Sequence, residues 1–505
     1  MSVDDPTDRI VRIVAAAVER DLDPVDDVGA AFDDVAEGDS DAPVPAEDGD
    51  APLVPRAMGF DVARMNTEFA LVLMGSKAVI MQQQSEGPIE DRVKLLTLDA
   101  FRAWFMNRPT EHLDKDGKIK RTTWAAAWLV ARARRQYRGI EFYPDPENAA
   151  NTEGYFNLWQ GFTVTPRAKA GGYSIFYDHL LTNVCGGSKT LATWVFGWFA
   201  HIMQRPRERV GTALVLRGRM GTGKSTIGEV MGSLIASHFF LVDDPRYLVG
   251  QFNAHMASCL LLQADEGFWA GDKAAEGRLK GLVTAETQMI EAKGVDPIRL
   301  KNYVRLLITS NNDWVVPAGK DERRFGVIDV GDGCAQNGEY FAELHQQLAD
   351  GGREALLHDL LHFDLTSVNL RQIPKTEALL EQKLRSLDAV DSWWFERLSA
   401  GTPTSKMEYW RCDMPVDELF NDFIACADKI GIKRKSEMTS FGIKMRRLVP
   451  GLKRVRLSVS DGHVGLKRVW CYTLPPLDDA RALFEAELSQ AVAWDDDPKP
   501  GETGS

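Results

Sequence analysis

Residues 212–226 read TALVLRGRMGTGKST, and this stretch decides the fold class. It opens as a short apolar run of the kind that forms a buried strand, and a helical pattern follows through Ser237. Between them stands G-x-x-x-x-G-K-S, whose glycines let backbone N–H groups surround phosphate oxygens at a positive helix N-terminus. The pattern predicts an α/β protein with a phosphate-binding loop (P-loop) made by Gly218, Gly221, Thr222, Gly223, Lys224, Ser225 and Thr226.

The cofactors expected at this loop are ATP and Mg²⁺, because Lys224 can neutralise the β- and γ-phosphates and Ser225 can ligate the metal ion. Further along, an apolar strand from Cys259 ends in Asp265 and Glu266. Parallel sheets bind ligands outside the carboxyl ends of their strands. We therefore expect Asp265 to hold Mg²⁺ through water and Glu266 to polarise the attacking water, the alternative being a solvated strand end or cap.

Two later segments offer further catalytic candidates. A third apolar strand begins at Arg305 and ends in two amides, of which Asn311 is expected to orient the lytic water. The alternative is an asparagine that merely favours the turn. Arg323 and Arg324 then precede another strand, where an arginine would reach the γ-phosphate of a neighbouring subunit. Arg324 is the preferred finger and Arg323 the second choice, against a plain ion pair with a neighbouring acid.

The composition is that of an ordinary globular chain, and it excludes several classes. With 505 residues, 44% hydrophobic and 26% charged, the chain is long enough for two to four domains and is neither collagen-like nor wholly disordered. Its longest nearly apolar stretch, residues 191–203, is shorter than the roughly 20 residues that cross a bilayer, so we expect no membrane partner. The acidic start does not resemble a signal peptide. The six cysteines form no C-x-x-C pair that would indicate zinc.

Charge is distributed unevenly along the chain. The net charge is −13, yet residues 1–52 alone hold 16 acids against 3 arginines, and residues 478–505 hold 8 acids against 2 bases. Such segments are typical of solvated tails. The expected organisation is an acidic disordered tail at 1–55, an N-terminal α+β or helical collar region at 56–205, an ATPase core at 206–370, a basic winged-helix-like domain at 405–477 and a second acidic tail at 478–505.

The motifs resemble those of superfamily 3 helicases, in particular the helicase part of phage and plasmid primase-helicases. The resemblance rests on GRMGTGKST, LLLQADEG, DERRF and the segment 277–312, and it covers roughly residues 65–365. It implies a hexameric, AAA+-like motor that hydrolyses Mg²⁺-ATP at subunit interfaces and travels 3′ to 5′ on single-stranded DNA. It also implies a pore hairpin that grips DNA through Lys293, Arg299 and Lys301, with Lys293 at its tip, the alternative being a solvated lysine near a turn.

Members of that family commonly carry an N-terminal primase domain. The acidic segment that precedes the matching region offers no carboxylate and histidine constellation of a polymerase. A primase, if one is used, is therefore expected to be a separate protein.

The sequence after Met414 changes character. Two amphipathic helical patterns are followed by a hairpin pattern that turns at Asp461-Gly462, which is typical of a winged helix with the hairpin as its wing. Residues 433–468 hold 11 bases and 2 acids, a density that favours phosphate contact. The alternative is docking against an acidic neighbour, including the chain's own tails. The expected DNA contacts are Lys444, Arg446, Arg447, Lys453, Arg454, Arg456, Lys467 and Arg468.

These features favour an ATP-dependent, ring-forming DNA helicase that replicates phage or mobile-element DNA in the cytoplasm of a bacterial host. Its expected partners are single-stranded and forked DNA. Two other classes stay open: a non-translocating AAA+ switch or loader, and a defence or regulatory NTPase. Strand displacement separates the first of these from a helicase, and activity on DNA without a protein partner separates the second.

Overall fold

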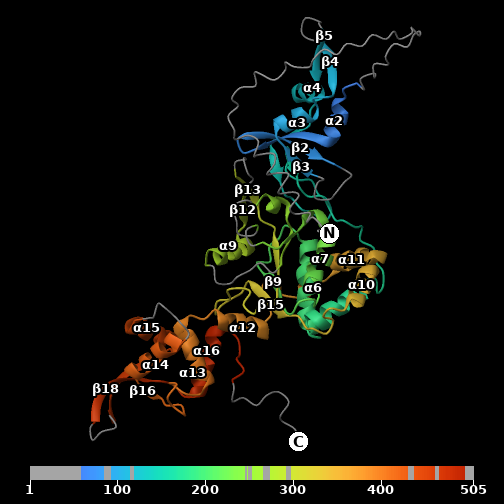
Figure 1. Cartoon of the computed structure of the whole chain (residues 1–505). Coiled ribbons are helices and arrows are strands. Elements are labelled where there is room, and N and C mark those ends of the chain that lie inside the picture. The colour runs from blue at the N-terminus through green and yellow to red at the C-terminus, as the bar shows by residue number, and fades with distance from the viewer. Residues whose placement is uncertain are drawn as a thin grey trace, which may run out of the picture.

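The computed structural model describes residues 59–84, 93–113, 119–244, 247, 253–265, 273–291, 297–429, 437–460 and 466–494. The expected tail at 1–55 lies outside these residues. The elements form three units that follow one another along the molecule, with the N-terminal strands at one end, a parallel sheet in the middle and a mostly helical unit at the other end (Figure 1). Within the described residues, no helix has the length and apolar character to cross a bilayer.

The N-terminal unit is built on the antiparallel hairpin of β1 (Phe69–Met74) and β2 (Lys77–Gln83). Its sheet has the order β3-β2-β1-β6. Phe69 packs against Phe101 and Phe105 with ring centroids 5.2 and 5.4 Å apart, so aromatic rings form much of this core. The other elements are α2 (Val62–Glu68), β3 (Val93–Leu96), α3 (Leu98–Trp104), β4 (Pro109–Leu113), β5 (Ile119–Thr123), α4 (Trp124–Val130), β6 (Gln136–Tyr137), β7 (Gly139–Glu141) and β8 (Tyr155–Asn157).

The central unit is a five-stranded, all-parallel sheet with the order β10-β11-β14-β9-β15. Every residue of β14 (Arg305–Ser310) is buried, as expected for a parallel strand covered on both faces. The other strands are β9 (Ala213–Arg217), β10 (Phe239–Val242), β11 (Leu261–Asp265) and β15 (Phe325–Asp329), and a two-stranded hairpin pairs β12 (Thr287–Ile290) with β13 (Ile298–Lys301).

Helices cover this sheet and join its strands. The sheet and its helices confirm a mixed α/β fold with a parallel sheet. The helices are α5 (Ser174–Asp178), α6 (Lys189–Gln204), α7 (Lys224–Ser233), α9 (Lys273–Thr284), α10 (Gly338–Gln347) and α11 (Arg353–His362), with π-helical turns at His179–Val184 and Leu348–Gly352 and 3₁₀ turns at Ala236–His238, Ala254–Ser258 and Leu365–Ser367.

The expected boundary between the collar region and the ATPase core, at residues 205 and 206, is wrong. The side chains of Trp159, Phe176 and Trp198 are buried in the same hydrophobic core as the strands of the central sheet. Trp198 also donates its indole N–H to the backbone oxygen of Thr212 at 3.3 Å, which ties α6 to the segment that leads into β9. The segment from about Trp159 to the P-loop therefore belongs to the central unit, because its apolar helix α6 covers the sheet.

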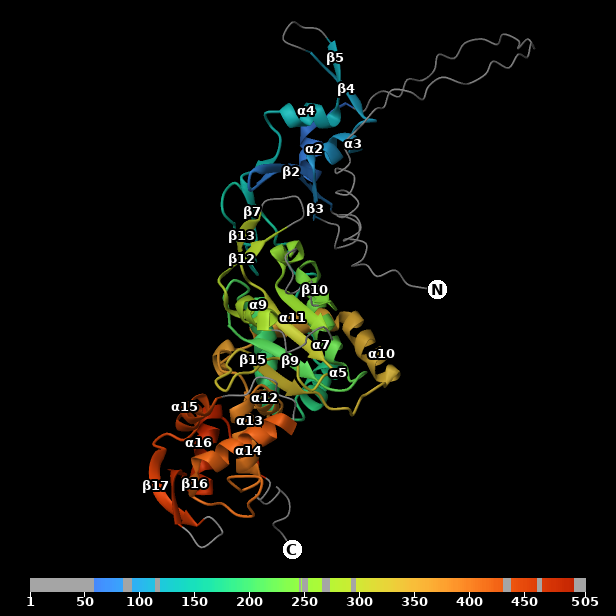
Figure 2. The ribbon, with the colours of Figure 1, turned by 60° about the vertical axis from the view of Figure 1, so that its left-hand side comes forward.

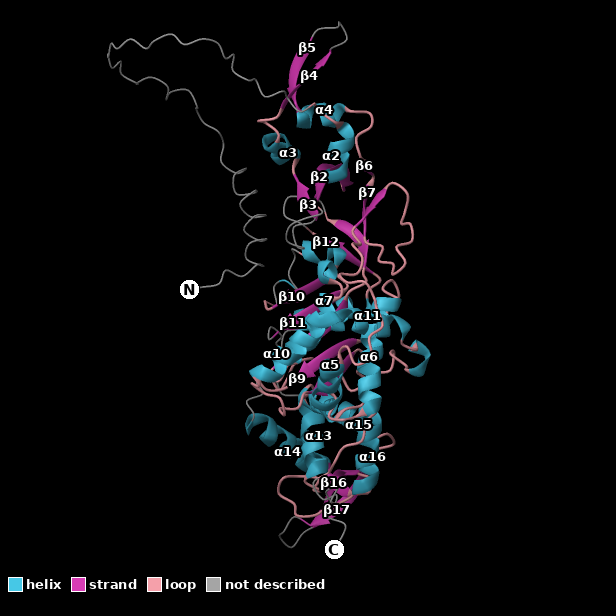
Figure 3. Cartoon of the chain, turned by 90° about the vertical axis from the view of Figure 1, so that its right-hand side faces the viewer, coloured by secondary structure: helices cyan, strands magenta, loops and turns pink. Residues whose placement is uncertain are grey.

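The C-terminal unit begins earlier than the expected 405, because Val390, Trp393 and Trp394 share its core with Phe423 and Phe441. Its strands form a small sheet with the order β16-β18-β17. Two helices followed by a long hairpin agree with the winged-helix pattern, and β16 adds a third strand (Figure 3). The elements are α12 (Glu377–Arg385), α13 (Ala389–Ser399), β16 (Asp413–Pro415), α14 (Val416–Lys429), α15 (Met438–Leu448), β17 (Lys453–Ser460), β18 (Leu466–Thr473) and α16 (Leu477–Leu488).

The expected second tail at 478–505 is wrong for residues 478–494. These residues hold most of α16, and Ala480, Phe484 and Leu488 are buried at a four-residue spacing that places them on one helix face. The acids Asp478 and Asp479 stand in the first turn, where they complement the helix dipole. The prediction of a tail rested on the net charge of this segment, which does not reveal the spacing of apolar residues that forms an amphipathic helix.

Candidate nucleotide site

The P-loop joins the end of β9 to the start of α7. Gly223 caps α7 with φ 79°, a left-handed conformation that glycine adopts without strain. A Cβ at Gly223 would lie 2.6 Å from Cε1 of His179, and a Cβ at Gly218 would lie 2.8 Å from the backbone oxygen of Val330. His179 and Val330 therefore pack so closely against the loop that neither Gly223 nor Gly218 can carry a side chain.

Lys224 turns back into the loop and is 6% exposed. Its Nζ donates to the backbone oxygens of Gly218 at 2.9 Å and Arg219 at 2.6 Å, and to Oδ1 of Asn311 at 2.8 Å. Asn311 directly follows β14, the strand that lies between β9 and β11. The fold therefore brings together a lysine and an asparagine that the sequence separates by 87 positions.

Asp265 lies at the carboxyl end of β11, as expected, and both of its oxygens accept hydrogen bonds. Ser225 Oγ donates to Oδ2 at 2.9 Å, and Thr309 Oγ1 donates to Oδ1 at 2.6 Å from the position opposite Asp265 on β14. Thr309 is a site residue that the motif analysis missed. Glu266, the expected water-polarising residue, lies outside the described residues.

A second layer of residues supports the loop from the π-helical turn after α5. His179 is fully buried, its Nε2 lies 3.3 Å from the backbone oxygen of Gly223, and its Nδ1 lies 3.6 Å from Sγ of Cys334. Cys334 also lies 3.6 Å from the backbone oxygen of Thr222. Burial lowers the pKa of His179, which favours the neutral ring. No sequence motif marks these residues, because they meet the loop only in three dimensions.

The two candidate finger arginines lie at the other end of the sheet. The backbone oxygen of Arg324 accepts from Ala213 N at 2.7 Å, at the start of β9, whereas the P-loop follows the end of that strand. Five residues of strand, about 16 Å, therefore separate Arg324 from the P-loop. Glu322 accepts hydrogen bonds from the backbone N–H groups of Arg323 and Arg324, and its Oε1 lies 3.7 Å from Arg324 Nη1.

The expected pore hairpin corresponds to β12 and β13. Arg299 donates from Nε to Thr287 Oγ1 at 3.1 Å across the hairpin, and Lys301 is exposed at its base. Ile298 packs against the N-terminal core, and the hairpin lies beside β7 of that unit (Figure 2). Lys293, expected at the tip, lies outside the described residues.

The expected DNA contacts of the C-terminal unit divide into two groups. On α15, Lys444 forms an ion pair with Asp388, and Arg447 lies 3.4 Å from Glu487 of α16. These two residues therefore contact acidic side chains of the chain itself, while the side chain of Arg447 stays 79% exposed. The side chain of Lys467 lies outside the described part, and the other members, Arg446, Lys453, Arg454, Arg456 and Arg468, are exposed.

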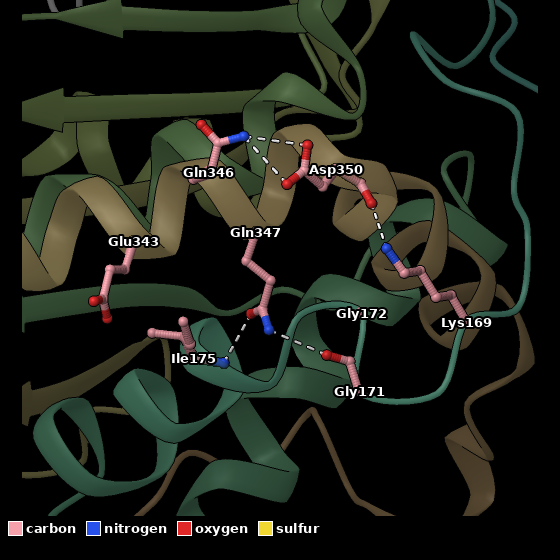
Figure 4. Close-up of a pocket in the computed structure, with 8 residues that line it drawn as sticks. All are labelled: Lys169, Gly171, Gly172, Ile175, Glu343, Gln346, Gln347 and Asp350. Atoms are coloured by element: carbon pink, nitrogen blue, oxygen red, sulfur yellow. Dashed lines mark hydrogen bonds between the residues drawn. The ribbon is translucent and has the colours of Figure 1, made fainter.

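A shallow hollow of about 480 Å³ lies between α10 and the segment before α5 (Figure 4). Its polar groups largely bond to each other: Gln347 accepts from Ile175 N at 3.0 Å and donates to Gly171 O at 3.2 Å, and Lys169 donates to Asp350 O. These contacts satisfy much of the polar lining and join α10 and the turn after it to residues 169–175.

Comparisons with known proteins find a family match and a phage relative. Residues 216–324, from the end of β9 to Arg324, match a family described as being of unknown function (DUF5906). Over 212 residues the chain is 26% identical to a DNA primase-polymerase of Nitratiruptor phage NrS-1, a match that covers 39% of this chain and 29% of the phage protein. The chain thus aligns with under a third of that relative's length.

A solved structure extends this likeness to most of the fold. The apo structure of the NrS-1 C-terminal region matches 82% of this chain and 98% of its own length, with a TM-score of 0.57 and 16% sequence identity. A second apo form of the same region gives the same values. The chain therefore shares its fold with the C-terminal region of a phage protein.

Proposed function

We propose that the chain is an ATP-hydrolysing DNA motor, a ring-forming helicase of the superfamily 3 type that acts in phage DNA replication. The observation that carries the proposal is the convergence of Lys224, Ser225, Asp265 and Asn311 at one edge of a parallel sheet, beside a glycine-rich loop at a helix N-terminus. Parallel α/β proteins bind nucleotides at this edge. The similarity to a phage primase-polymerase supports the setting in DNA replication.

The residues fit Mg²⁺-ATP. The three oxygens that now accept from Lys224 Nζ mark a position from which the ammonium group can contact phosphate oxygens instead. The Ser225 hydroxyl and the Asp265 carboxylate are hard oxygen ligands, which Mg²⁺ prefers. Bound Mg²⁺-ATP would supply the phosphoryl group whose hydrolysis drives movement. Asn311 would orient the attacking water, and Glu266 keeps its expected role as the residue that polarises it.

The position of Arg324 supports assembly into a ring. Its side chain is 26% exposed, and its buried Nε makes no hydrogen bond within the described residues. Since Arg324 lies at the opposite end of the sheet from its own P-loop, it can complete a site only in a neighbouring subunit. A head-to-tail contact of this kind closes into a ring, which we expect to be a hexamer.

The proposed substrate is single-stranded or forked DNA, gripped in the ring by the β12–β13 hairpin through Lys293, Arg299 and Lys301.

The test is ATP hydrolysis and strand displacement on a forked duplex. Lys224→Ala and Asp265→Asn should each lower turnover roughly a hundredfold or more, because each removes charge stabilisation at the phosphates or the metal ion. Lys189→Ala, at an exposed lysine that opens α6, is the matched control and should match the wild type. Unchanged turnover in Lys224→Ala would refute the nucleotide site. Wild-type hydrolysis without strand displacement would instead favour a switch or loader.

A further inference from the structure

The wing of the C-terminal unit carries an exposed tryptophan. Trp470 on β18 is 47% exposed, although large aromatic side chains are usually buried. The third strand, β16, pairs with β18 only from Cys471 to Thr473, so the hairpin projects beyond the sheet from Trp470 outward. The wing lies at the end of the molecule farthest from the N-terminal unit (Figure 3).

Two arginines of β17 lie against this ring. Arg456 is the cross-strand partner of Trp470, and its Cζ lies 5.8 Å from the ring centroid. The Cζ of Arg454 lies 4.8 Å from the same centroid. Arg468, two positions before Trp470, shares its face because side chains alternate along a strand. We call the set Arg454, Arg456, Arg468 and Trp470 the wing platform.

The positive charge of the wing platform is not balanced by acidic residues on its own two strands. The described residues of β17 and β18 include no Asp or Glu. On α15, by contrast, Lys444 and Arg447 are already paired with Asp388 and Glu487. A cation near an exposed ring stabilises a fold by only about 0.5–1 kcal/mol, so stability alone is a weak reason for two arginines and an exposed tryptophan here.

We propose that the wing platform binds an unpaired base of single-stranded DNA, with the base stacked on the plane of Trp470 and the flanking phosphates contacted by the arginines. Planar guanidinium groups and an indole ring stack on any base, whereas the bases of a duplex are already stacked on each other. A surface that contacted only duplex phosphates would need the charges but not the ring. The choice of DNA rests on the proposed function.

The experiment measures binding of the full-length protein, without nucleotide, to fluorescent oligonucleotides of equal length. The probes are oligothymidine, an abasic deoxyribose-phosphate strand, a duplex and oligouridine. Trp470→Ala should weaken binding to oligothymidine roughly fivefold to a hundredfold, in line with one base–aromatic stack, and leave binding to the abasic strand unchanged. Trp470→Phe should retain most of the binding, because it keeps an aromatic face.

Two further variants separate stacking from charge. Arg454→Lys keeps the charge but loses the planar group, so it should weaken binding to oligothymidine more than binding to the abasic strand. Tyr409→Ala removes another exposed aromatic ring of the same unit, 73% exposed, and should bind every probe as the wild type does.

The proposal fails if Trp470→Ala binds oligothymidine like the wild type, or if it loses affinity equally for the abasic strand or only for the duplex. Tighter binding of oligouridine than of oligothymidine would overturn the assignment to DNA. Because no nucleotide is present, an inactive P-loop would leave these results unchanged, so failure of the motor and failure of the wing platform are distinguishable.

Discussion

At the scale of single residues, the residue types allowed in the candidate nucleotide site are limited mainly by close packing against the P-loop glycines. The motif explains why glycine is needed beside phosphate, but at Gly223 the ring of His179 adds a second reason. Its left-handed φ of 79° adds a third. Three independent requirements therefore meet at one position.

Gly223→Ala should accordingly destabilise the protein and abolish nucleotide binding. The left-handed backbone alone costs an L-residue roughly 1–2 kcal/mol, and the added methyl group must also displace both His179 and Phe341. Gly277→Ala in α9 is the control, because its Cβ would meet nothing within 4 Å and alanine favours a helix. Urea unfolding and binding of a fluorescent ATP analogue provide the measurements. Wild-type stability in Gly223→Ala would contradict both the backbone strain and the close contact with His179.

At the scale of elements, His238, which directly precedes β10, contacts two other segments: the loop of Trp159 and Gln160, and the 3₁₀ turn that ends at Ser258. The backbone N–H of Gln160 donates to its Nε2 at 2.9 Å, and its Nδ1 lies 2.8 Å from the backbone oxygen of Ser258. Its ring stacks on Trp159 with centroids 4.6 Å apart. Because Nε2 accepts and Nδ1 donates, both contacts require the neutral ring.

The protein should therefore lose stability in mild acid. Burial lowers the pKa of His238 to about 4, below the unfolded value near 6.5, so its stabilisation is complete above pH 6.5 and is lost as the pH falls from there toward 4. The loss amounts to about 3 kcal/mol over that whole range, and half-buried His201 and His255 add to it with the same sign. Urea unfolding at pH 7.5 and 5 should show a smaller difference for His238→Gln than for the wild type. His345→Gln, at an exposed site on α10, should keep the wild-type difference; equal differences in all three proteins would exclude His238 as a cause.

The elements that could be predicted are those whose pattern lies within one short stretch of sequence. The strands ending at Arg217, Asp265 and Ser310 are apolar runs followed by polar chemistry, and this pattern located both the sheet and the edge where the site lies. The contacts of His179 and Thr309 could not be predicted, since each depends on which elements become neighbours. The boundary at 205 failed for the same reason: an apolar helix does not specify the sheet that it covers.

At the scale of the whole molecule, each nucleotide site is expected to need two subunits. Lys224→Ala and Arg324→Ala proteins should each be inactive, because one lacks the phosphate contact and the other the finger. Equal mixtures should regain about a quarter of the wild-type hydrolysis, since about a quarter of the head-to-tail interfaces then combine an intact P-loop with an intact finger. Hydrolysis against mixing ratio is the measurement. Mixtures that stay inactive, in rings shown to exchange subunits, would remove Arg324 from the mechanism.

Helix α12 also has a consequence at this scale. Glu381 pairs with Arg217, the residue directly before the P-loop; Gln382 accepts from the backbone of Val315 in the central unit; and Lys383 donates to the backbone oxygen of Leu488 at the end of α16. Three consecutive side chains thus fasten the rim of the nucleotide site to the unit that bears the wing. Under the proposed function, any displacement of Arg217 between the ATP-bound and ADP-bound states would be passed through α12 to the C-terminal unit. The orientation of the wing relative to the central sheet would then differ between the two nucleotide states.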